Sequence, residues 1–145
     1  MLKAAVIILS ILFIYSVVVE LICIIRPTFM LESFFQSVTG DTLAQIQDDD
    51  YLKAITILDR AMAFYAFMAS IAATFILFTA FRKAQKWAWW ALLIVGAGGW
   101  LWGLIDNLVV GGGIAIPIYS IGTVIFLVGI FLPVKTFFGK AAEKA

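Results

Sequence analysis

The chain contains no histidine and a single cysteine, Cys23, among its 145 residues. Without histidine, the chain by itself cannot form a His-ligated haem site, a His-containing zinc or copper site, or a Ser-His-Asp triad. One cysteine excludes an internal disulfide and a CxxC redox pair. No activating partner surrounds Cys23, so we predict a buried, small apolar residue there. The sequence therefore predicts no catalytic residue, no metal site and no cofactor.

Charged residues are also scarce: they make up 13% of the chain, against roughly 25% in a soluble domain. Hydrophobic residues account for 64% of the chain, and the mean hydropathy is +1.09. The net charge of +1 gives no reason to expect a nucleic-acid partner. This composition is typical of an integral membrane protein, whose first partner is the lipid bilayer.

Long apolar runs account for most of the composition; they cover residues 4–25, 58–81, 87–110 and 114–134. Each reaches the roughly 20 residues that a helix needs to cross about 30 Å of hydrocarbon. Segments of about 10 residues with alternating polarity, typical of barrel strands, do not occur. No small-x-small cleavage pattern follows the first run, so we expect a retained span rather than a signal peptide. We predict an all-α, four-helix bundle that forms a single transmembrane domain over residues 1–145.

The basic residues predict the orientation of this bundle. If the spans alternate, one side carries Lys3, Arg82, Lys83, Lys86, Lys135, Lys140 and Lys144, and the other carries Arg26, Lys53 and Arg60. An excess of Lys and Arg marks the cytoplasmic side. We therefore predict a multi-pass protein of the cell (inner, cytoplasmic) membrane with both termini in the cytoplasm and residues 26–57 as an outer loop.

The outer loop contains a further helical pattern after the first span ends at Arg26-Pro27. Its apolar residues recur at helical spacing between polar ones: Leu31, Phe34, Phe35 and Val38. This pattern predicts a short amphipathic helix that lies flat at the outer interface and ends near Gly40.

Three consecutive aspartates, Asp48, Asp49 and Asp50, form the densest charge in the chain. Calcium loops place their acids at alternate positions, so we interpret this run as a solvated loop with Asp50 as a helix N-cap. Asp41 is expected to cap an earlier helical turn through Gln47. From Tyr51 the helical pattern runs to Phe81, a length of about 46 Å, so the second span is predicted to project beyond the bilayer.

Asp106 is the one charge in the third apolar run, where an unpaired charge would be costly. Glu20 near the end of the first span and Arg60 near the start of the second lie at a similar predicted depth. We therefore predict an intramembrane polar cluster of Glu20, Arg60 and Asp106. It is either an ion cluster that fixes helix register or a site for a ligand or a proton, because one arginine cannot fully neutralise two carboxylates.

Small residues predict which helix faces pack together. Gly99 and Gly103 form a GxxxG motif on the face of Asp106, which indicates that this face is directed inward. Gly122 and Gly129 share one face of the fourth span. We predict helix packing at all four glycines.

Three tryptophans, Trp87, Trp89 and Trp90, follow Lys86 at the start of the third span. Aromatic rings at headgroup depth hold helix ends in place, so we predict that all three are interfacial anchors.

The segment Lys86-Trp87-Ala88-Trp89-Trp90-Ala91-Leu92-Leu93 enters a span that ends in Asp106, and Asp59-Arg60 opens the second span. With a proline just after the first span, this pattern resembles small uncharacterised prokaryotic four-span membrane proteins, loosely the DoxX-like group. The resemblance implies a four-helix membrane fold and supplies no catalytic residue.

These observations predict a non-catalytic membrane protein that serves as an accessory or structural subunit of a larger membrane complex, with other subunits or further copies of itself as partners. An alternative is a lipophile-binding or proton-coupled transport protein that uses Glu20, Arg60 and Asp106. A second alternative is a lipid-modifying enzyme in which the two carboxylates serve as acid and base, although no nucleophile accompanies them.

Overall fold

The computed structural model describes residues 1–113 and 115–139, and this part of the chain contains helices and no strand. Its longer helices are α1 (Leu2–Ile25), α2 (Thr28–Thr39), α3 (Asp49–Thr79), α4 (Lys86–Gly96), α5 (Trp102–Val110) and α6 (Ala115–Phe131). Its shorter elements are η1 (Leu43–Gln45), η2 (Phe81–Lys83), the π-helical turn η3 (Ala97–Leu101) and α7 (Val134–Phe138).

Within these residues, four helical segments are long and apolar enough to cross a membrane: Leu2–Ile25, Asp49–Lys83, Lys86–Val110 and Ala115–Phe138. The predicted all-α class is therefore confirmed, and each of the four segments predicted to span the membrane lies in a helical segment long and apolar enough to do so. Lys140 and Lys144, which contributed to the predicted orientation, lie outside the described residues.

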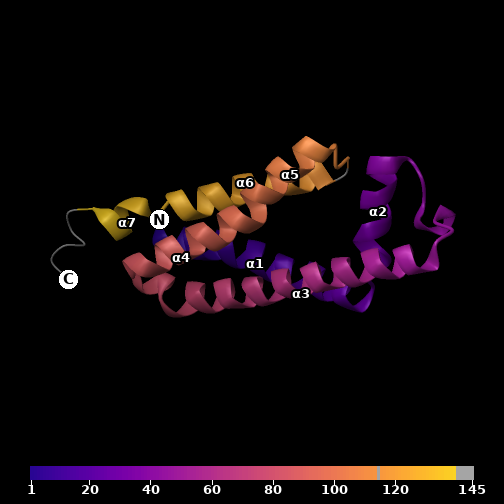
Figure 1. Ribbon diagram of the computed structural model, residues 1–145. Coiled ribbons are helices and arrows are strands. Elements are labelled where there is room, and N and C mark those ends of the chain that lie inside the picture. Colours follow the sequence, from indigo (N-terminus) through magenta and orange to yellow (C-terminus); the bar gives the residue numbers. More distant parts are fainter. Residues whose placement is uncertain (114, 140–145) are drawn as a thin grey trace.

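The four segments run side by side along one axis (Figure 1). α1 packs against α3 and α6, α4 packs against α3, and η3 and α5 pack against α6, which closes the bundle. The N-terminus and α7 lie at one end of the bundle, here called the terminal end, and α2 lies at the opposite end, here called the α2 end (Figure 1).

The apolar core fills the terminal half of the bundle. Its fully buried large side chains include Leu9 of α1, Leu77 of α3, Leu92 of α4 and Phe126 of α6. Phe137 of α7 closes this end and packs on Phe81, with the ring centroids 4.8 Å apart. No member of this core lies on α2 or α5, so the two halves of the bundle are packed differently.

The outward faces of all four spans carry large apolar side chains. Examples are Ile11, Phe75, Ile94 and Val124, each at least 60% exposed. Apolar surface of this extent would be unfavourable in water but matches the hydrocarbon of a bilayer. The helices therefore present apolar residues both to the core and to lipid.

The connection before α3 differs in detail from its prediction. Asp48, not Asp50, is the N-cap of α3, and its Oδ1 accepts hydrogen bonds from the backbone amides of Asp50 (2.9 Å) and Tyr51 (3.0 Å). Thr42, not Asp41, caps the helical turn η1, where it forms a capping box with Gln45. Asp48 takes the cap position because the helical backbone begins at Asp49, and Asp48 itself is extended, as an N-cap residue typically is.

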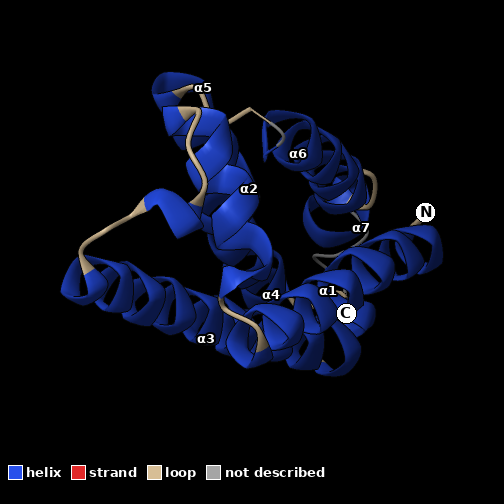
Figure 2. Cartoon of the chain, turned by 90° about the vertical axis from the view of Figure 1, so that its right-hand side faces the viewer, coloured by secondary structure: helices blue, strands red, loops and turns tan. Residues whose placement is uncertain are grey.

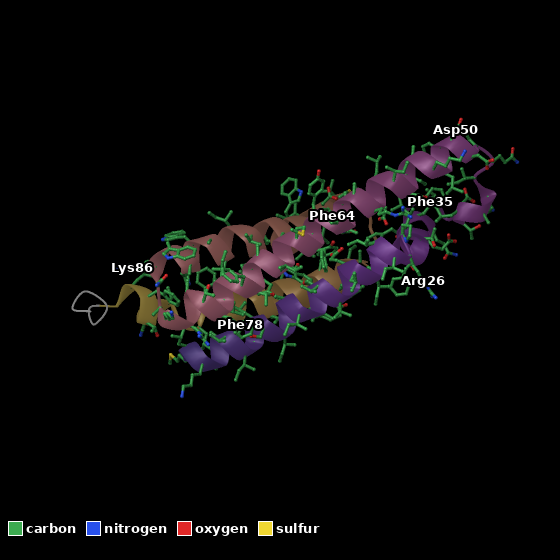
Figure 3. All side chains as sticks on the ribbon, turned by 90° about the horizontal axis from the view of Figure 1, so that it is seen from below. Arg26, Phe35, Asp50, Phe64, Phe78 and Lys86 are labelled. Carbon is green, nitrogen blue, oxygen red and sulfur yellow. The ribbon has the colours of Figure 1, made fainter. Side chains whose placement is uncertain are left out.

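α2 crosses the end of the bundle instead of continuing along it (Figures 1 and 2). It contacts α1 and α3, and its Ser37 lies against Gly113 in the turn between α5 and α6. Glu32 Oε2 accepts a hydrogen bond from the Leu43 amide at 3.2 Å, which ties η1 to α2. α2 buries no residue completely, so it covers this end without joining the core. The start of α3 projects past α2 and carries Asp50 at its tip (Figure 3).

The three tryptophans of α4 do not share one environment. Trp87 and Trp90 are exposed, whereas Trp89 is only 4% exposed, so the prediction of an interfacial anchor is wrong for Trp89. The last carbonyls of a helix have no amide partner within that helix. Trp89 Nε1 donates a hydrogen bond to one of these, the Ile130 carbonyl, at 2.8 Å. Trp89 therefore joins α4 to the end of α6.

We expect Trp89→Phe to destabilise the protein by about 1–3 kcal/mol, because it leaves the buried Ile130 carbonyl without its donor. Trp87→Phe is the matched control, since Trp87 is exposed and its indole donates only to the neighbouring Gln85 side chain. Thermal unfolding in a neutral detergent measures both. Equal melting temperatures for the two variants would contradict this role of Trp89.

Candidate functional site

A cavity of about 170 Å³ lies between the helices in the half of the bundle that the core leaves unfilled. α1, α3, α6 and the α4–η3 segment form its walls. Met30 and Phe34 of α2 also line it. Most of the lining is apolar, and the side chains with polar atoms are Tyr15, Ser16, Glu20, Ser70, Trp100 and Tyr119.

Small residues leave this space open. α3 contributes Ala66, Ala69 and Ala73 to the wall, and the α4–η3 segment contributes Gly96 and Gly99. A Cβ atom added at Gly99 would meet no heavy atom within 4 Å. The cavity is therefore a consequence of residues with little or no side chain on two helices that face each other.

The π-helical turn η3 shapes the wall next to Gly99. The Trp100 ring of this turn lies directly on Gly122 of α6 and makes an edge contact with Tyr119, with the centroids 5.9 Å apart. The Trp100 carbonyl accepts a hydrogen bond from Thr123 Oγ1 at 3.0 Å. A π turn disturbs the regular backbone hydrogen bonding of a helix, and here a side chain from α6 supplies a donor.

Three of the four glycines predicted to pack against a neighbouring helix do so, and the one in the π turn does not. Gly103 lies against the Tyr119 ring, Gly122 against Trp100, and Gly129 against Leu9. Gly99 contacts no neighbouring helix and opens into the cavity, so its prediction as a packing residue is corrected. Gly99 lies within the π turn, whereas Gly103 lies in the regular helix α5 beyond it. Gly96, which lies against Phe126, is a close contact that the sequence argument missed.

Two acidic residues, Glu20 and Asp59, lie on α1 and α3, which pack against each other and form walls of the cavity. Glu20 of α1 lines the cavity and is half-buried. Asp59 of α3 lies close enough to Glu20 for their charges to interact. Asp59 Oδ2 is buried and has no hydrogen-bond partner among the described residues. We call Glu20 and Asp59 the acid pair.

The predicted cluster of Glu20, Arg60 and Asp106 is not formed as an ion cluster. Arg60 and Asp106 are both exposed, and the one ion pair within residues 1–113 and 115–139 joins Lys53 to Asp50. Consecutive helical residues point about 100° apart, so Asp59 and Arg60 cannot both face α1. The structure directs the acid inward and the base outward.

On α5, the buried polar residue is Asn107 and not Asp106. Asn107 Nδ2 donates to the Gly103 carbonyl at 2.8 Å, and its side chain lies against Gly112. Asp106 is close enough for its charge to act on Tyr119 but does not line the cavity. The rotation introduced by the π turn explains why a regular helical wheel placed Asp106 on the inward face.

Cys23, one turn beyond Glu20, is buried, as predicted for a small apolar residue. It lies close enough to both members of the acid pair to sense their charges. The residue that sequence reasoning left out of the site is therefore Asp59. The available signal was its adjacency to Arg60, which requires that only one of the two faces inward.

No family model, no curated protein and no solved structure matches this chain. The resemblance to DoxX-like proteins therefore stays a prediction. The function has to be argued from the cavity and the acid pair.

We expect Glu20→Gln and Asp59→Asn to leave the melting temperature unchanged or higher, because neither change removes a partner of an opposite charge. Loss of one member of a buried ion pair would instead cost about 3–5 kcal/mol. Thermal unfolding in neutral detergent measures both variants, and Arg60→Gln serves as a control at an exposed position. A marked destabilisation by all three substitutions would restore the ion-cluster interpretation.

Proposed function

We propose that this chain is a non-catalytic membrane protein that binds a small lipophilic ligand in the cavity between its helices. The observation that carries this proposal is an apolar cavity of about 170 Å³ with Glu20 in its wall. Binding sites for small molecules are typically apolar concavities with a few placed polar groups. An engineered apolar cavity of about 150 Å³ is large enough for benzene, so this one has room for a ring or a short branched chain.

The cover over the cavity supports ligand entry at the α2 end. Met30 and Phe34 of α2 close the cavity there, but no residue of α2 is fully buried. Segments with few buried contacts open at a lower free-energy cost than core helices. α2 is also bounded by Pro27 on one side and by Gly40, in a left-handed conformation, on the other. We propose that α2 moves away to admit the ligand.

The charge distribution supports a location in the cytoplasmic membrane of the cell. The terminal end carries five basic residues of the described chain, Lys3, Arg82, Lys83, Lys86 and Lys135, whereas the α2 end carries three, Arg26, Lys53 and Arg60, among the acids Glu32, Asp41, Asp48, Asp49 and Asp50. The excess of basic residues favours a cytoplasmic terminal end. In this orientation α2 lies at the outer interface, and the ligand enters from the outer side.

The outward apolar faces do not by themselves favour a larger complex, because lipid covers such faces as well as a partner subunit would. The accessory-subunit function and the homo-oligomer predicted from the sequence stay predictions. The cavity has room for a small apolar molecule, which supports ligand binding rather than a purely structural role.

We expect Gly99→Leu to abolish the uptake of one equivalent of toluene, because the new side chain would fill the open space at this position. Gly98→Leu is a matched control: Gly98 lies in the same π turn, is exposed and has equally open surroundings, but does not line the cavity. Equilibrium dialysis of radiolabelled toluene against the purified protein in neutral detergent measures the difference. Equal uptake by wild type, Gly98→Leu and Gly99→Leu would refute the proposal.

The orientation predicts which introduced cysteines react from outside the cell. In a Cys23→Ser background, we expect Ser33→Cys on α2 to be labelled by a membrane-impermeant maleimide, because Ser33 is exposed at the α2 end. Lys83→Cys, exposed at the terminal end, should react only after the cells are opened. Gel shift of the labelled protein reads out both positions, and the reverse pattern would invert the orientation.

A further inference from the structure

Glu20 connects the acid pair to the cavity, because it is the member of the pair that lines the cavity wall. Glu20 also interacts with Asp59. One part of the site is an apolar chamber walled by small and aromatic residues. The other part is the pair of carboxyl groups.

The acid pair is without a cationic partner. Neither Glu20 nor Asp59 forms an ion pair in the described part of the chain, and Arg60 next to Asp59 is exposed. Asp59 Oδ2 is buried with no hydrogen-bond partner among these residues. A buried polar atom without a partner costs free energy that a ligand with a suitable donor would recover. A protonated amine supplies both N–H donors and the positive charge that this pair lacks.

A metal ion does not fit this place. Among the described residues, no group of three or more Cys, Asp or Glu side chains is arranged to hold one. Calcium takes 6–8 oxygen ligands, and magnesium requires near-octahedral coordination. Two carboxyl groups beside an apolar chamber match an organic cation better than either ion, because only an organic cation fills both parts of the site.

The aromatic walls agree with an organic cation. Trp100 and Tyr119 line the cavity together, and Tyr119 lies close enough to Glu20 to interact with its charge. Aromatic faces attract ammonium groups and also accommodate apolar rings. The chamber is thus suited to the part of a ligand next to its charged nitrogen.

We propose that the ligand is a lipophilic amine whose protonated nitrogen sits between Glu20 and Asp59 and whose apolar group occupies the cavity. This inference rests on the proposed function and adds the chemical class of the ligand. Each carboxylate accepts an N–H hydrogen bond, and the positive charge offsets the repulsion between the two acids. The apolar group fills the chamber beside Gly99.

The experiment compares two probes of nearly equal size, benzylamine, which is protonated at neutral pH, and benzyl alcohol, which is not. Equilibrium dialysis against the full-length protein in neutral detergent measures both affinities. A charge-assisted hydrogen bond contributes about 1.5–3 kcal/mol, so we expect wild type to prefer the amine by at least about tenfold. A parallel dialysis against detergent without protein measures the uptake of each probe by the micelles, and this uptake is subtracted before the two affinities are compared.

Substitutions in the acid pair test whether these two residues cause the preference for benzylamine over benzyl alcohol. We expect Glu20→Gln and Asp59→Asn each to reduce the preference for benzylamine to within about threefold, with the affinity for benzyl alcohol unchanged. Asp106→Asn is the matched control, because this exposed acid lies on α5 outside the cavity, and it should keep the wild-type preference. Loss of the preference in both acid-pair variants, and not in the control, supports the proposal.

Three results would overturn the inference. Equal affinity of wild type for both probes would show that the acid pair holds a proton or water instead of an amine. A preference that survives in both acid-pair variants would show that the amine is recognised elsewhere. In both of these cases the proposed function would still hold if wild type and Gly98→Leu take up toluene and Gly99→Leu does not. Absence of saturable binding for toluene and both probes would remove the proposed function and this inference together.

Discussion

A bilayer interior offers no water to the backbone, so every amide and carbonyl in a spanning segment must find its partner within the protein. Regular helices meet this requirement along most of the four spans. Where the helices depart from regularity, side chains of a neighbouring helix complete the hydrogen bonding. Thr123 donates to the Trp100 carbonyl in the π turn, and Trp89 donates to the Ile130 carbonyl at the end of α6. These two contacts join the third and fourth spans at the places where each is irregular.

The π turn connects this backbone requirement to the site. Because Thr123 supplies a donor to its carbonyl, the turn can present Trp100 to α6 and leave Gly99 open to the interior. The terminal half of the bundle is filled by Leu and Phe side chains, whereas the α2 half contains alanines and glycines at the corresponding places. The bundle therefore has one end that supplies stability and another that leaves a chamber with Glu20 in its wall. This division is what favours ligand binding over a purely structural role.

Much of the architecture followed from the sequence because it depends on local composition. The four spans, the helix at residues 28–39 and the buried Cys23 all reflect apolar runs, helical spacing or the absence of reactive neighbours. The predicted ends of helices were less accurate, since capping depends on which side chain reaches a free amide. Asp48 caps α3 for that reason, although Asp50 is closer to the apolar run.

The site followed from the sequence only in part. Glu20 was identified because a carboxylate within an apolar run is energetically costly unless it has a partner or a function. Arg60 was assigned to the site from its predicted depth, and Asp106 from its predicted depth and a regular helical wheel. Both residues are exposed in the structure. The sequence by itself determined how many helices are long and apolar enough to span a bilayer and which residues carry charge within them. Only the tertiary structure decided that Asp59 faces Glu20 beside a cavity, because helix rotation and the π turn arise from packing between spans.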